Sequence, residues 1–293
     1  MIRALALVLA IAACGPAARP AVHAAAGDDD TADDGPVFSY TKFTPRSFTA
    51  KVTGKGRPVI FIPGLGCPGD VWDDTVAKLD GIQAHVLTLA GFAGEKPIKP
   101  PLAATVRHEL VRYIRANHLV APIVVGHSMG GFIAYWIAET APGLIGGVIV
   151  VDAGPALADT DVETARSLRN MWAQAGDDEL PEQVRTAYSS MVSDPKEIAP
   201  YIDEIARSDR QTMGDAIYEL VTTDLRDQLA KIKAPLLLVL ADGGYQQMYR
   251  TQVEPVKDHE VVVLAKTRHF VMFDDPDGFV QAIEKFLADH PAP

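Results

Sequence analysis

Short apolar runs recur along the chain from residue 37 onward and alternate with segments of helical periodicity. Four continuous runs predict buried parallel strands, because a strand covered on both faces loses the alternation of apolar and polar residues. They lie at 57–62, 84–89, 121–126 and 146–152. Two more strands are predicted at 235–240 and 259–264, and an opening hairpin at 37–43 and 47–53. The pattern predicts an α/β fold: a mostly parallel, eight-stranded sheet with helices on both faces.

Helix start signals accompany two of the periodic segments. Apolar residues at helical spacing follow Thr105, which predicts a helix with that threonine as its N-cap. The last helix is predicted to open at Asp275-Pro276, because an acidic cap and a proline in the first turn favour a helix start.

Residues 153–234 interrupt the alternation. They contain no convincing strand but several helical patterns, such as Ala165, Leu168 and Trp172. An interval of 82 residues is too long for a simple connection. We therefore expect a helical cap, inserted between the sixth and seventh predicted strands of a core made of 37–152 and 235–293.

The first residues, MIRALALVLAIAAC, place one positive charge before an apolar run that is too short to span a bilayer. This pattern predicts an export signal within residues 1–26 and a periplasmic or extracellular protein. Two processing routes stay open. Cys14 closes a lipobox-like segment and would become a lipidated, membrane-anchored first residue; alternatively, cleavage follows Ala24-Ala25-Ala26. Residues 27–36 are acidic, lack periodicity and predict a disordered tether.

Composition narrows the classes of partner. With 293 residues, 48% of them hydrophobic, the chain can bury a large core. The net charge of −11 disfavours nucleic acids and anionic membrane surfaces, since no basic stripe is available to bind phosphates. Cys14 and Cys67 are the two cysteines, too few for a metal cluster or a disulfide framework, and Cys67 is expected to pack in the core. The oligomeric state stays open.

One motif carries candidate chemistry. The spacing Gly126-x-Ser128-x-Gly130 follows a predicted strand and precedes a predicted helix, the setting of a nucleophile elbow. A serine hydroxyl needs a base to activate it and an acid to orient that base. His269 lies between the last predicted strand and the last helix, at the same end of the sheet as the elbow. His127, inside the motif, is expected to serve packing.

At these residues the chain resembles the α/β-hydrolase fold family. The segments FIPGLGCPGDVW, LTLAGFAG, GHSMGG and RHFVMFDDP are similar to its oxyanion loop, its segment after the fourth strand, its elbow and its histidine loop. In detail the chain resembles serine esterases of the methyl-ester carboxylesterase type, although Pro63 stands where a histidine is more usual. The oxyanion donors are expected to be the backbone N–H groups of Leu65 and Met129.

The triad acid has two candidates. Most members of that family carry it just past the seventh strand, where this chain has Asp242; others carry it at the end of the sixth, where Asp152 follows four apolar residues. We favour Asp152, because a carboxylate that ends a buried strand needs a partner, with Asp242 as the alternative.

Together these features predict a serine hydrolase that cleaves esters of small or medium acyl groups through an acyl-enzyme, without metal or cofactor. Cleavage of an amide, a lactone or a carbon–carbon bond by the same residues is the alternative within hydrolases. A binding protein that keeps the fold without turnover is the alternative outside them.

Overall fold

The computed structural model describes residues 43–157, 160–177 and 179–293. At its centre lies one seven-stranded sheet in the order β1-β3-β2-β4-β5-β6-β7, in which neighbours pair in parallel except for β1 against β3. The strands are β1 (Phe48–Gly54), β2 (Arg57–Ile62), β3 (Ile82–Leu89), β4 (Ile123–His127), β5 (Gly147–Val151), β6 (Leu236–Ala241) and β7 (His259–Leu264).

The predicted α/β class and mostly parallel sheet are confirmed, but the described residues form seven strands and not eight. The missing strand is the first limb of the predicted hairpin, residues 37–43, which lies outside the described residues except for Phe43. The second limb pairs antiparallel with β3 as β1.

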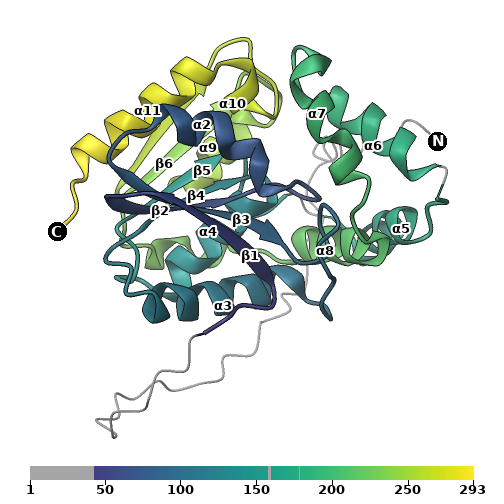
Figure 1. Ribbon diagram of the computed structural model, residues 1–293, viewed down its shortest axis with the longest axis horizontal. Helices are drawn as coiled ribbons and strands as arrows, with labels where there is room; N and C mark the ends of the chain where they lie inside the picture. The colour runs from purple at the N-terminus through teal and green to yellow at the C-terminus, as the bar shows by residue number, and fades with distance from the viewer. Residues whose placement is uncertain (1–42, 158–159, 178) are drawn as a thin grey trace, which may run out of the picture.

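Helices cover both faces of the sheet (Figure 1). On one face α2 (Asp73–Lys78) packs with α11 (Pro276–Asp289), and on the other α3 (Leu102–Ala116) packs with α4 (Met129–Thr140). Shorter elements complete the core: η2 (Gly69–Trp72), η3 (Arg226–Lys231), α9 (Gln246–Val253) and α10 (Val271–Asp274). The predicted start of the last helix is confirmed, because Asp275 caps α11 by accepting a hydrogen bond from the N–H of Gly278.

The predicted start of α3 is wrong. The helix begins at Leu102, and Thr105 lies within it, its hydroxyl donating to the carbonyl of Pro101. The N–H groups of Ala103 and Ala104 donate to the carboxylate of Glu219, both over 2.8 Å. The cap of this helix therefore comes from a residue more than 100 positions away, which local sequence does not reveal.

In the described residues, four α-helices lie between β5 and β6, ahead of η3: α5 (Val162–Ala173), α6 (Leu180–Ser189), α7 (Pro195–Ile205) and α8 (Arg210–Thr222). They group at one side of the sheet in Figure 1, and α8 packs against both α5 and the core helix α3. We call α5–α8 the cap helices. The predicted signal (1–26), tether (27–36) and Cys14 lie outside the described residues. No helix in the described ranges is long and apolar enough to cross a membrane.

Candidate active site

The predicted elbow is a strained turn between β4 and α4. Ser128 has φ +53°, a backbone conformation that costs a non-glycine residue about 1–3 kcal/mol. Its N–H donates to the carbonyl of Val151 on the neighbouring strand over 3.0 Å, which ties the turn to the sheet. The side chain is thereby held out at the carboxyl edge of the sheet.

Gly126 and Gly130 make this turn sterically feasible through close approach. A Cβ on Gly126 would collide with the carbonyl oxygen of Gly130, and one on Gly130 would collide with the carbonyl oxygen of Ile62. Both glycines have ordinary negative φ, so the strained torsion falls on Ser128 itself. The motif spacing thus reflects how tightly α4 packs back against β4 and β2.

Asp152 and His269 form the central contact of the site. The Nδ1–H of His269 donates to Oδ2 of Asp152 over 2.7 Å, and both side chains are nearly buried. The other carboxylate oxygen, Oδ1, accepts from the N–H of Ala241 over 3.1 Å. Asp152 directly follows β5 and also has a positive φ, +44°, so both Ser128 and Asp152 occupy strained positions at adjacent strand ends.

The structure places Asp242 elsewhere. Its side chain is exposed and accepts a hydrogen bond from the N–H of Lys266 over 3.2 Å. Of the two candidate acids, the one that contacts the histidine is therefore Asp152.

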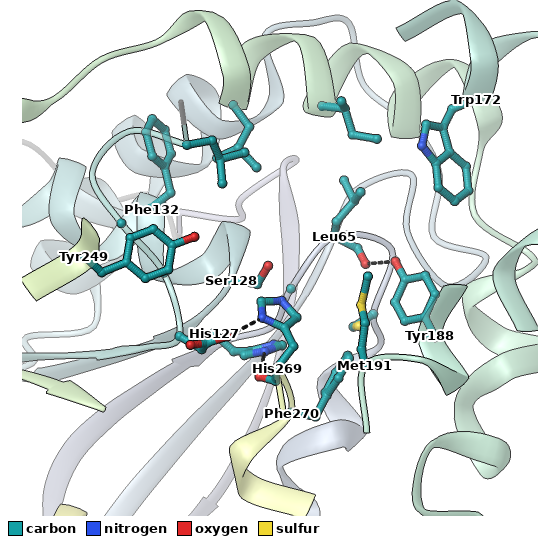
Figure 2. A pocket seen from close by; sticks show the side chains of 18 residues that line it. Leu65, His127, Ser128, Phe132, Trp172, Tyr188, Met191, Tyr249, His269 and Phe270 are labelled. Atoms are coloured by element: carbon teal, nitrogen blue, oxygen red, sulfur yellow. Dashed lines mark hydrogen bonds and ion pairs between the residues drawn. The ribbon is translucent and has the colours of Figure 1, made fainter. Parts of the chain in front are cut away.

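Ser128 and His269 line the same cavity, of about 90 Å³, although 141 positions separate them in the chain. In Figure 2 the Ser128 hydroxyl lies beside the ring of His269. The wall is mainly apolar. Its residues include Phe132 from α4, Trp172 from α5, Ile217 and Leu220 from α8, and Leu157 and Met191 from the connections before α5 and after α6. The roof residues, which sequence alone did not identify, thus include members of α5 and α8.

His127, for which only a packing role was expected, also makes a hydrogen bond to the backbone of His269. Its ring is fully buried, and its Nε2–H donates to the carbonyl oxygen of His269 over 2.9 Å. Burial, and secondarily the proximity of His269, holds the pKa of His127 well below its usual value, so the ring is neutral. This bond fixes the backbone of the loop that carries His269.

Of the two predicted oxyanion donors, Leu65 lines the cavity and Met129 directly follows Ser128. Met129 is the first residue of α4, where the N–H groups have no partner within the helix. Leu65 lies in a turn closed by the Cys67 N–H, which donates to the Gly64 carbonyl over 3.2 Å. Because the N–H and C=O of a trans peptide point in opposite directions within its plane, the Leu65 N–H points away from the Gly64 carbonyl that Cys67 binds.

Two hydroxyl groups contributed by the cap helices and their connection hold the next two peptides of that turn. The Tyr188 hydroxyl, on α6, donates to the carbonyl of Leu65 over 2.6 Å (Figure 2). The Ser208 hydroxyl, between α7 and α8, donates to the carbonyl of Gly66 over 3.2 Å. Sequence reasoning missed both residues, because a tyrosine or serine in a helical region carries no signal of a partner 120 or more positions away.

Cys67 adjoins the turn but is not a second nucleophile. Its side chain is fully buried, and burial raises the pKa of its thiol far above the usual range, so it stays protonated. Within the described residues, no group of three or more histidine, cysteine, aspartate or glutamate side chains is arranged to hold a metal ion.

Comparisons with known proteins place this geometry in a family. The sequence profile of the alpha/beta hydrolase family matches residues 59–282. The pimeloyl-[acyl-carrier protein] methyl ester esterase of Aeromonas hydrophila is 24% identical over 254 residues, covering 80% of this chain and 96% of that protein. An esterase of Mycobacterium tuberculosis is also 24% identical, covering 87% and 91%.

Solved structures share the fold at lower identity. The enol-lactonase from Burkholderia xenovorans superposes with a TM-score of 0.73 at 16% identity, covering 82% of this chain and 96% of that one. A thermophilic esterase from Thermogutta terrifontis gives 0.74 at 19%, covering 83% and 94%. The family profile spans most of the chain and includes Ser128 at the elbow, Asp152 and the loop of His269. The chain therefore belongs to the alpha/beta hydrolase family.

Proposed function

We propose that this protein is a serine hydrolase that cleaves small, neutral carboxylic esters through an acyl-enzyme. The observation that carries the proposal is the 2.7 Å bond between His269 and Asp152 at a cavity that also holds the strained Ser128. The esterase names of its relatives agree with this chemistry.

In the proposed reaction, Asp152 fixes the tautomer of His269. Since Nδ1–H donates to the carboxylate, Nε2 is the nitrogen left to accept a proton. Ser128 attacks the ester carbonyl while Nε2 takes its proton, and the resulting imidazolium returns it to the departing alkoxide. Water, activated by the same nitrogen, then releases the acid and restores Ser128.

In this proposal the backbone N–H groups of Leu65 and Met129 stabilise the negative charge that develops on the carbonyl oxygen of the substrate during attack. Such donors act most strongly when they are oriented before the reaction, because no reorganisation is then needed. The turn hydrogen bond from Cys67 and the bond from Tyr188 supply that orientation for the Leu65 side.

The cavity supports a small and uncharged substrate. Among the described residues that line it there is no lysine or arginine to neutralise a substrate carboxylate. A cavity of about 150 Å³ accepts benzene, and one of about 90 Å³ suits an acyl group of roughly two to four carbons.

The test is hydrolysis of p-nitrophenyl esters from acetate to octanoate by wild type and Ser128→Ala. We expect kcat/KM to be highest between acetate and butyrate and to fall for octanoate. The Ser128→Ala variant should lose at least about 10³-fold in kcat. No turnover by folded wild type would favour a non-catalytic binding role. Equal turnover by both proteins would show that Ser128 is not the nucleophile.

We also propose that residues 1–26 direct export and that Cys14 becomes lipidated. The support is the charge at Arg3 followed by a short apolar run. In a bacterial host that processes lipoproteins, full-length wild type should fractionate with membranes, and Cys14→Ser should move to the soluble fraction. Identical fractionation of the two would exclude the anchor.

A further inference from the structure

Tyr249 brings a hydrogen-bond donor to the cavity that the proposed reaction does not use. It lies on α9, and only 2% of the side chain is exposed, yet it lines the cavity and its hydroxyl points into it (Figure 2). No hydrogen bond joins that hydroxyl to any residue in the described part of the chain. Unlike the covered polar atoms of the described residues, this hydroxyl faces the cavity, so a molecule bound there can reach it and accept its hydrogen bond.

Apart from the Ser128 hydroxyl and Nε2 of His269, which the proposed reaction uses, the other polar side-chain groups of the wall are engaged or covered. His269 and Asp152 bind each other, and the Tyr188 hydroxyl is bound to the Leu65 carbonyl. The indole N–H of Trp172 also lacks a partner among the described residues, but it is covered by neighbouring atoms. Besides the reacting groups, Tyr249 is thus the side-chain donor of the described wall that a bound substrate can reach.

The surroundings of Tyr249 hold its ring in one place. Tyr245 stacks on it, with ring centroids 5.9 Å apart and planes inclined by 21°. On another side Gly154, two residues after Asp152, leaves the space that the ring fills, since a Cβ there would collide with the ring. Burial, and secondarily the charge of Asp152, raises the pKa of Tyr249, so the hydroxyl keeps its proton and acts as a donor.

Tyr249 lies away from the predicted oxyanion turn. In Figure 2 it lies on the opposite side of Ser128 from Leu65, whose N–H is assigned to the carbonyl oxygen. A substrate whose carbonyl faces Leu65 therefore presents a different atom to Tyr249.

Resting on the proposed function, we infer that the Tyr249 hydroxyl binds a second oxygen of the substrate, so that the enzyme selects small neutral esters carrying an ether, hydroxyl or carbonyl oxygen beyond the ester group. The apolar remainder of the wall would bind the alkyl part, and this one donor would distinguish an oxygenated substrate from its hydrocarbon counterpart.

The experiment compares wild type with Tyr249→Phe on ester pairs in which an ether oxygen replaces one methylene. On the acyl side the pairs are p-nitrophenyl methoxyacetate against butyrate, and 3-methoxypropionate against pentanoate. On the alcohol side the pair is 2-methoxyethyl acetate against butyl acetate. For each pair, kcat/KM of the ether ester is divided by kcat/KM of its hydrocarbon counterpart. Comparing this ratio between wild type and Tyr249→Phe removes the difference in intrinsic reactivity between the two esters.

We expect Tyr249→Phe to lower that ratio by about two- to tenfold in at least one pair, the range of one neutral hydrogen bond. Its melting temperature should stay at or above that of wild type, since no internal bond is lost. Tyr188→Phe is the matched control: it removes a hydroxyl that is bound within the protein, so it should slow both members of a pair alike.

Unchanged ratios in all three pairs, with turnover that still depends on Ser128, would overturn the role of Tyr249 and leave the proposed function intact. Loss of Ser128 dependence would overturn both.

Discussion

The carboxylate of Asp152 accepts a 2.7 Å hydrogen bond from Nδ1 of His269, and the two residues are 117 positions apart in the chain. The contact forms because Asp152 directly follows β5, beside the strand that leads into Ser128. The loop of His269 is brought to the same edge after β7 and is held by the Nε2–H of His127.

The first prediction separates the two candidate acids. Asp152→Asn should lower kcat by about 10²- to 10⁴-fold, because an amide favours the wrong histidine tautomer. Asp242→Asn should stay within about twofold, since that carboxylate is exposed and bonded to Lys266. Steady-state kinetics on one p-nitrophenyl ester, with circular dichroism to check folding, measures both. A severe loss in Asp242→Asn alongside a nearly normal Asp152→Asn would reverse the assignment.

The second prediction concerns the bond between the cap helices and the oxyanion turn. Tyr188→Phe removes the donor to the Leu65 carbonyl, so the turn should lose part of its fixed orientation. We expect kcat to fall about threefold to tenfold, while KM for a small ester stays nearly constant.

Tyr201→Phe provides the control for that measurement. Tyr201 is another tyrosine of the cap helices, but its ring stacks on Phe273 and does not line the cavity. The kcat of the Tyr201→Phe variant should equal that of wild type. A rise in KM with unchanged kcat in Tyr188→Phe would show that this hydroxyl affects substrate binding and not the turn.

The third prediction is a pH dependence of stability. Glu139, on α4, is buried, and one of its carboxylate oxygens has no hydrogen-bond partner in the part of the chain that the structure describes. Burial raises its pKa to about 7 against the opposing effect of Lys231 and Arg107. A carboxyl group with a raised pKa in the folded state favours folding below its unfolded pKa of about 4.5. That contribution is lost as the pH rises through about 7.

Glu139→Gln removes this titration. The variant should be more stable than wild type at pH 8 by about 1–3 kcal/mol, whereas the difference should be smaller at pH 5. Denaturant unfolding at the two pH values measures it. An equal difference at both would show that Glu139 does not titrate between them.

Much of the fold could be predicted, because each buried parallel strand is visible in its own stretch of sequence as an unbroken apolar run. β2, β6 and β7 lie within one residue of their predicted bounds. The start of α3 was not predictable, since the groups that cap it belong to Glu219 on a distant helix. Local sequence carries helix propensity and caps, but a tertiary cap depends on packing that forms only in the folded chain.

The residues of the site also differ in whether the nearby sequence identifies them. Ser128 and His269 could be selected because an elbow motif and a loop after the last strand mark them within the chain. The choice between Asp152 and Asp242 depended on which carboxylate reaches the imidazole, a question of geometry across the sheet. Tyr188 and Tyr249 had no local signal, since nothing near them in the sequence distinguishes a cavity-lining tyrosine from one that packs.

The most direct test of the central claim is labelling by a fluorophosphonate, which reacts with an activated serine hydroxyl. Folded wild type should gain one adduct, located on Ser128 by peptide mass spectrometry. Ser128→Ala should gain none, and His269→Ala should react at least about 10²-fold more slowly. The account is contradicted if wild type remains unlabelled, or if the adduct forms on another residue and persists in Ser128→Ala.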